Sequence, residues 1–132
     1  METIKSYTDI PQSKRLAEFL PLESADMFYD GVQDLYKEKV YNIPINGSSI
    51  TVRTGHIITE KGVKANLLLP CWSLSALLNI LAKQDFIIKS SERNNEYQYN
   101  IDIPSRHCKI WFSSLLDAAF EMIIWLKENN KL

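Results

Sequence analysis

The sequence has no excess of positive charge and few glycines, and each shortage argues against a class of function. Fifteen Lys and Arg side chains stand against sixteen Asp and Glu side chains, which gives a formal net charge of −1. Nucleic-acid-binding domains are usually basic because they neutralise backbone phosphates, so we expect no strong, sequence-independent binding to DNA or RNA. With four glycines in 132 residues, a glycine-rich loop that cradles nucleotide phosphates is hard to build.

Common enzyme and metal-site motifs are also missing. The sequence contains no Gly-x-Ser-x-Gly, no His-Glu-x-x-His and no paired-cysteine motif. Cys71 and Cys108 lack metal-ligand spacing and have apolar neighbours, so we expect two buried free thiols rather than a disulfide. The sequence therefore favours a protein that is not an enzyme, with no cofactor and no bound metal.

Long apolar runs are lacking as well. None approaches the roughly 20 residues that a membrane-spanning helix needs, and Met1–Ile10 lacks the apolar segment of a secretory signal. We therefore expect a cytoplasmic protein that makes no membrane contact. The length and the 45% hydrophobic content fit one globular domain, residues 1–132.

Three amphipathic helices are indicated. The first is predicted from about Ile10 to Leu20, after a cap at Thr8 or Asp9, and it is stopped by Pro21. The second is predicted to begin near Ser73 after an extended run that Pro70 ends, and the third near Ser113 or Ser114. The apolar stripe of the second helix, which we expect to be buried, consists of Leu74, Leu77, Leu78 and Leu81.

The first half of the chain also carries a hairpin signal. Residues 21–36 favour an extended segment with a turn at Gly31. Asn46-Gly47 is typical of a type I′ turn, which would place Ile43 opposite Ile50 and Tyr41 opposite Val52. Pro44 cannot donate to a ladder, so its strand is expected at a sheet edge. A further strand is predicted over residues 56–59.

The second half predicts a three-stranded meander. Its strands are expected over residues 86–89, 96–103 and 108–112, with a polar loop over 90–95, and Cys108 is expected to share a buried face with Ile110 and Phe112. The predicted fold is therefore α+β. An antiparallel sheet, made of the N-terminal hairpin and the C-terminal meander, packs against about three helices.

Five segments together resemble a known group of proteins. They read QSK at 12–14, LPLESADM at 20–27, PCWSLSALL at 70–78, DAAFEMI at 117–123 and WLKEN at 125–129. The chain resembles small uncharacterised proteins of Bacteroidetes genomes and of the phages and prophages of those bacteria. The resemblance implies an accessory protein encoded by a mobile element, and it implies no activity or site residue.

Two residues are candidates for enzyme chemistry. Cys71 lies near the start of the second helix, whose partial positive charge would lower the pKa of a thiol, and His56 or His107 could then act as its base. A buried structural cysteine is the alternative interpretation. Asp26 lies between Ala25 and Met27, in an apolar context where a carboxylate must be hydrogen-bonded or paired.

Two further features are candidates for binding. Tyr97 and Tyr99, with the aromatic residues 111 and 112, could stack the bases of a single strand, although only Lys89, Arg93, Arg106 and Lys109 are near. The acidic stretch from residue 18 to residue 34 could hold a divalent cation, but it matches no EF-hand and favours a solvated face. The leading interpretation is a small non-enzymatic interaction protein with a protein partner or self-association. An enzyme using Cys71 or Asp26 and a single-strand binder remain alternatives.

Overall fold

The computed structural model describes residues 5–32, 35–42, 50–53, 56–59 and 64–132, and it describes side chains over 5–29 and 69–132. These residues form two compact units. The N-terminal unit is Asp9–Ser73, and the C-terminal unit is Leu74–Leu132 together with the segment that ends at Thr8. Each unit combines helix with antiparallel strands, so the α+β class is confirmed. A single domain over the whole chain stays a prediction.

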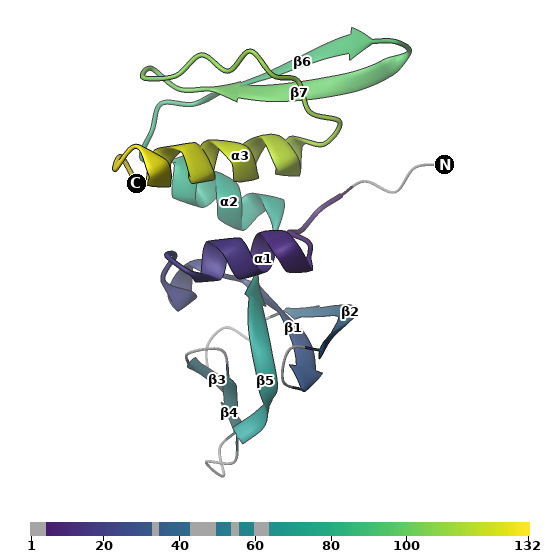
Figure 1. The fold of residues 1–132 in the computed structure, drawn as a ribbon, viewed down its shortest axis with the longest axis vertical. Helices are drawn as coiled ribbons and strands as arrows, with labels where there is room; N and C mark the ends of the chain where they lie inside the picture. Colours follow the sequence, from purple (N-terminus) through teal and green to yellow (C-terminus); the bar gives the residue numbers. More distant parts are fainter. Residues whose placement is uncertain (1–4, 33–34, 43–49, 54–55, 60–63) are drawn as a thin grey trace. The chain divides into compact units, whose positions relative to one another are not determined.

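The N-terminal unit is built on a five-stranded antiparallel sheet (Figure 1). The strand order is β2-β1-β5-β4-β3, which makes β5 the central strand. The helix α1 packs against β5, and its Leu16 is fully buried. The elements are α1 (Ile10–Ala17), a 3₁₀ turn (Leu22–Ser24), β1 (Met27–Val32), β2 (Leu35–Asn42), β3 (Ile50–Arg53), β4 (His56–Thr59) and β5 (Lys64–Cys71).

The predicted pairing of Tyr41 with Val52 is wrong. Tyr41 lies opposite Phe28 of β1, and Val52 lies opposite Ile57 of β4. This pairing joins β2 to β1, the strand that precedes it in the chain. The strand that precedes Pro44 is at a sheet edge as predicted, and β4 matches the strand predicted at 56–59. Residues 43–49, with the predicted turn and Ile43, are outside the described residues.

Gly31 and Pro70 interrupt strands less than the sequence predicts. Gly31 belongs to β1, where the register against β2 shifts between Tyr29 and Gly31, so the glycine marks an irregular pairing rather than a turn. Pro70 does not end the extended run, because β5 continues to Cys71. The recorded pairs between β5 and β4 stop at Leu67, and a proline that cannot donate is tolerated where a strand has one neighbour.

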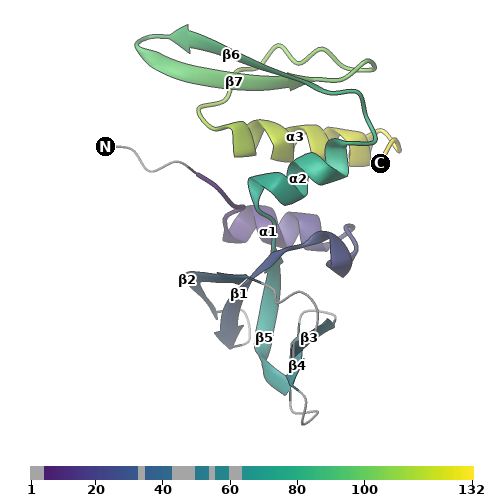
Figure 2. The ribbon, with the colours of Figure 1, turned by 180° about the vertical axis from the view of Figure 1, so that it is seen from behind.

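The C-terminal unit contains two helices and one β-hairpin. These are α2 (Leu74–Leu81), β6 (Ile87–Arg93), β7 (Glu96–Asp102) and α3 (Leu115–Glu128). The helix α3 packs against both α2 and β7 (Figures 1 and 2). The core side chains that this packing buries are Leu77, Leu81, Ile101, Ile103, Leu116, Ala119, Met122, Ile123 and Leu126. Within the described residues, no helix is long and apolar enough to span a membrane.

The hairpin is longer than predicted because a two-residue turn replaces the expected polar loop. Asn94 and Asn95 join β6 to β7 with φ angles of 53° and 65°. Positive φ at both central residues is the requirement of a type I′ turn, and asparagine tolerates this region better than most residues. The strand β6 therefore runs through Ser90–Arg93, and the expectation of a loop there is wrong.

The third strand of the meander is also absent from the described structure. Residues 103–114 contain two isolated bridges, Tyr99 with Phe112 and Ile103 with Arg106, and no named strand. Between these bridges the side chains of β7 bind the backbone of Cys108 in place of a ladder. Ile110 is 59% exposed and Cys108 is half-buried, so the predicted core face of this segment is wrong.

The predicted helix starts agree with the structure better than the predicted helix ends do. Asp9 caps α1 and shares a capping box with Gln12, but the helix ends at Ala17 instead of near Leu20. Ser114 accepts a hydrogen bond from the Asp117 amide, which confirms the predicted start of α3. The helix α2 begins at Leu74 as predicted. Of its four stripe leucines, Leu77 and Leu81 are fully buried, whereas Leu74 and Leu78 are half-buried.

Candidate functional site

Exposed apolar side chains concentrate on the hairpin of the C-terminal unit. Among the described side chains, five large hydrophobic residues are exposed, and four of them lie between residues 87 and 110. We call these four the hairpin surface. They are Ile87 (61% exposed), Ile88 (42%), Tyr97 (65%) and Ile110 (59%), and the fifth exposed residue is Leu132. Ile110 lies in the segment that follows β7, and the other three lie on the β6–β7 hairpin. Apolar groups that remain this exposed are candidates for contact with a partner.

The hairpin surface extends around an unpaired sheet edge. Ile87 lies opposite Asp102 and Ile88 opposite Ile101. Successive residues of a strand point to opposite faces, so the two isoleucines flank the β6 edge on both sides. The two-stranded sheet has the order β6-β7, and none of the described strands pairs with the outer edge of β6. Its free backbone donors and acceptors can accept an extended segment.

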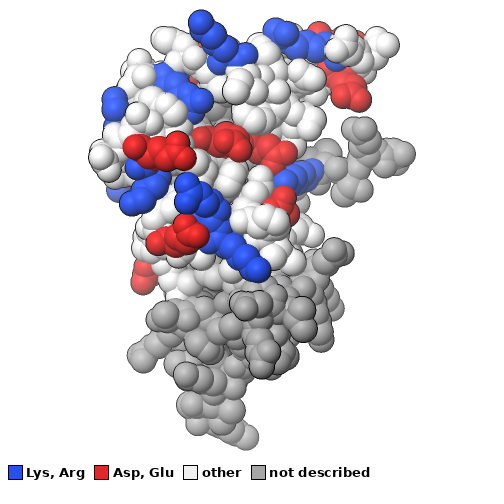
Figure 3. Space-filling model, in the orientation of Figure 1, with Lys and Arg blue, Asp and Glu red and all other residues white. Residues whose placement is uncertain are grey.

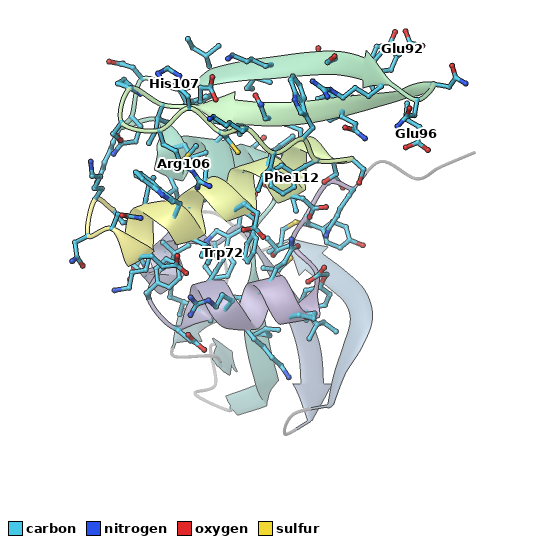
Figure 4. The ribbon with its side chains drawn as sticks, turned by 45° about the horizontal axis from the view of Figure 1, so that its top comes forward. Trp72, Glu92, Glu96, Arg106, His107 and Phe112 are labelled. Carbon is cyan, nitrogen blue, oxygen red and sulfur yellow. The ribbon has the colours of Figure 1, made fainter. Side chains whose placement is uncertain are left out.

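Charges of both signs surround this edge. Arg93 lies over the Trp111 ring, with the guanidinium carbon 4.6 Å from the ring centroid. The acidic Glu92 and Glu96 lie at the turn of the hairpin, and His107 lies toward its other end (Figure 4). On the face that Figure 3 shows, blue and red side chains are interspersed over the described part of the chain. Charges of both signs are therefore mixed around the hairpin surface, so we expect a partner to bind it mainly through apolar contacts.

Asp102 is the buried polar centre beneath this surface. Its side chain is 5% exposed, and it forms an ion pair with Lys89 of β6. Its Oδ1 atom accepts a hydrogen bond of 2.8 Å from the Cys108 amide, and its Oδ2 atom lies 3.6 Å from His107 Nδ1. The hydrogen bond from Lys89 lowers the pKa of the Asp102 carboxyl, against the opposing effect of burial. The carboxylate is therefore held ionised.

Asn100 completes the attachment of the chain after β7. Its Nδ2 atom donates a hydrogen bond of 3.0 Å to the Cys108 carbonyl. Among the described groups, no donor bonds the buried Asn100 Oδ1 atom. Asn100 and Asp102 thus hold both backbone groups of Cys108, one as donor and one as acceptor.

Asp26 meets the requirement that the sequence placed on it. Its Oδ1 atom accepts a hydrogen bond of 2.9 Å from the Ser73 amide, and its Oδ2 atom accepts one from the Ser73 hydroxyl. Ser24 and Trp72 lie nearby, joined by a 2.9 Å hydrogen bond from Trp72 Nε1 to Ser24 Oγ. The Ser73 hydroxyl, at the position predicted to cap α2, donates to this carboxylate. This arrangement joins Pro21–Asp26 to the end of β5.

The cysteines are free but differ in burial. Cys71 is completely buried in the N-terminal unit, and Cys108 is half-buried in the C-terminal unit. The prediction of two free thiols is confirmed, whereas the prediction that both are buried is wrong for Cys108. His56 and Cys71 belong to the same sheet, but the side chain of His56 is outside those described. His107 belongs to the other unit.

The tyrosines of the proposed stacking platform are not equally accessible. Tyr97 is exposed, but Tyr99 is half-buried and its backbone pairs with Phe112. Trp111 is covered on one face by Arg93. Only Tyr97 therefore offers a largely free ring among the four aromatic residues proposed for a platform.

The acidic stretch forms no metal site that the structure records. Over the described residues, no three His, Cys, Asp or Glu side chains come together in a group that could hold an ion. Glu18 pairs with Arg15 at 3.1 Å, and Asp26 binds Ser73. The side chains of Asp30 and Asp34 are outside those described.

Asp102 and Asn100 were not predicted from the sequence, because their partners come from different segments of the chain. Lys89 is thirteen positions before Asp102, and Cys108 is six positions after it. One signal was present. Both residues are polar, alternate with Tyr99, Ile101 and Ile103, and precede the turn at Pro104, which is where side chains can bind a returning backbone. Comparison of the chain with protein-family models, with curated proteins and with solved structures finds no match.

Proposed function

We propose that this protein is a small non-enzymatic interaction protein that binds a protein partner through the hairpin surface. The observation that carries the proposal is the pair Ile87–Ile88, exposed on both sides of the unpaired β6 edge. Covering one such side chain is worth about 1.5–3 kcal/mol. An added strand would supply backbone hydrogen bonds, and the two isoleucines would supply side-chain contacts.

The two residues considered for enzyme chemistry also support this proposal, because Asp26 is hydrogen-bonded and Cys71 is inaccessible. Both carboxylate oxygens of Asp26 accept hydrogen bonds from Ser73. The Cys71 side chain has no exposed surface from which it could reach a substrate. A general base or a nucleophile must reach the reacting atom, and neither residue is placed to do so.

Cellular placement and origin belong to the same proposal. A cytoplasmic location fits the two free thiols, since free thiols are kept reduced in that compartment. An accessory role in a mobile element is what the resemblance to the phage and prophage proteins of Bacteroidetes supports. Both statements extend the interaction hypothesis and are tested separately from it.

Site-specific photocrosslinking tests the proposal in cells. A photoreactive amino acid at position 88 should crosslink to one protein, or to a second copy of this chain, and the same group at Leu132 serves as the matched control. Leu132 is also exposed but lies outside the hairpin. The double substitution Ile87→Ser and Ile88→Ser should abolish the crosslink from a group placed at Tyr97.

Sedimentation velocity then separates self-association from binding to another protein. A crosslink from position 88 that is no stronger than the one from position 132 would contradict the proposal. Salt-sensitive binding to single-stranded oligonucleotides that Tyr97→Ala removes would favour the single-strand binder instead.

A further inference from the structure

The segment between β7 and α3 has few attachments. Residues 104–110 are mostly exposed, and the bridges Ile103–Arg106 and Tyr99–Phe112 hold only its two ends. Between the bridges, the backbone attachments to β7 are the two hydrogen bonds at Cys108, one from Asn100 and one to Asp102. We call residues 104–112 the flap.

Asp102 is the charged group of that central attachment. Its carboxylate faces the Lys89 ammonium from β6, and the His107 imidazole and the Cys108 amide from the flap. The helix α3 also packs against β7, but within the described residues it adds no ion pair or hydrogen bond to this carboxylate. One negative charge therefore faces the Lys89 ammonium and the His107 imidazole, which lie on separate segments.

We infer that Asp102 is a latch whose ionised carboxylate holds the flap closed, and that the flap opens locally when this carboxyl group loses its charge. Neutralisation removes the attraction to Lys89. It also weakens the hydrogen bond from the Cys108 amide, because an ionised acceptor forms a stronger hydrogen bond than a neutral one. Side chains of the flap add two ring contacts, Arg93 over Trp111 and Arg106 over Trp125. Between the bridges, however, its backbone is attached to β7 only at Cys108, whose amide binds the charged carboxylate, so the flap is the part that moves.

The charge state of the latch follows from its surroundings. The hydrogen bond from Lys89 lowers the pKa of Asp102, so the latch stays charged at pH values where an ordinary aspartate begins to protonate. At neutral pH the flap is closed. Acid opening requires a pH below about 3.9, which is the ordinary pKa of an aspartate. The isosteric substitution Asp102→Asn removes the charge at any pH and avoids this limit.

Opening would also alter the hairpin surface, because Ile110 lies on the flap. This consequence rests on the proposed function, whereas the latch itself does not. The experiment for the latch accordingly needs no partner.

Amide hydrogen exchange at pH 7 tests the latch with the whole chain. In the Asp102→Asn protein, the Cys108 amide should exchange at least about tenfold faster than in the original protein, while the Ile123 amide of α3 keeps its rate. The matched control is Glu92→Gln, which removes an exposed charge from the hairpin turn and should leave both rates unchanged (Figure 4). An unchanged Cys108 rate in Asp102→Asn would overturn the inference. So would a parallel increase at both amides, because the unit would then unfold as a whole.

A second measurement follows the original protein through acid. Between pH 6 and pH 2.5, exchange at Cys108, corrected for the intrinsic pH dependence, should accelerate before exchange at Ile123 does. If both amides lose protection at the same pH, acid acts on the whole unit and the latch is refuted.

Discussion

The Asp26 Oδ1 atom lies 2.9 Å from the Ser73 amide nitrogen, forty-seven residues later in the chain. This hydrogen bond, with the second one from the Ser73 hydroxyl, joins the start of β1 to the residues that follow β5. Asp26 itself lies in the partly buried segment that follows the 3₁₀ turn. The role of Asp26 is therefore to hold two segments together.

Replacing Asp26 by alanine is expected to lower the free energy of unfolding by about 1–3 kcal/mol. The substitution removes two hydrogen bonds to a carboxylate, and losing hydrogen bonds to a charged group costs about that amount. Urea unfolding followed by circular dichroism measures the change. Asp26→Asn keeps one acceptor oxygen and should cost less, and equal losses in the two variants would contradict this account.

Acid should destabilise the C-terminal unit through Asp102. The lowered pKa of this carboxyl stabilises the folded state at pH values above the unfolded-state value of about 3.9, and this contribution disappears as the pH falls through the folded value. Stability measured by urea unfolding from pH 6 to pH 3 should therefore fall less in Asp102→Asn than in the original protein. A pH profile of the same steepness in both proteins would refute the assignment.

The turn at Asn94-Asn95 should respond to substitutions according to the sign of φ. Asn95→Gly is expected to leave stability unchanged or raise it, because glycine adopts a φ of 65° without steric cost. Asn95→Val should cost about 1–2 kcal/mol, because a side chain branched at Cβ is crowded in the left-handed region. Thermal unfolding of the two variants provides the comparison, and equal melting temperatures would rule out the proposed strain.

Two leucines of α2 should differ in their contribution to stability. Leu77 is fully buried, so Leu77→Ala is expected to cost about 2–5 kcal/mol. Leu78 is half-buried, so Leu78→Ala should cost clearly less. Chemical denaturation of the pair provides an internal control, since both substitutions remove the same atoms from one helix. A larger loss at Leu78 would contradict the observed burial.

The sequence predicts helix starts better than strand partners, for a physical reason. A helix start depends on local groups, as Asp9 and Ser114 show by accepting hydrogen bonds from amides three residues later. A strand partner depends on which distant segment offers the better face, and Tyr41 pairs with Phe28 although a turn signal lies just after it. Local patterns therefore predicted the α+β class but not the sheet order.

The candidate site shows the same division. Tyr97 was predicted from its aromatic ring and is exposed, and Asp26 was predicted to need a partner and has one. Asp102 was not identified, because its alternation with apolar residues before a turn is also typical of a solvent-facing aspartate. Only the returning flap and Lys89 make it a buried anion.

Pro70 limits how large the sheet of the N-terminal unit can become. Beyond Leu67 no strand among the described residues covers the β4 side of β5, so an incoming chain could in principle add there. Proline has no N–H group, and a strand that approached Pro70 would find a missing donor in the middle of its ladder. Position 70 of the central strand therefore offers no backbone donor to an added strand, whereas β6 contains no proline.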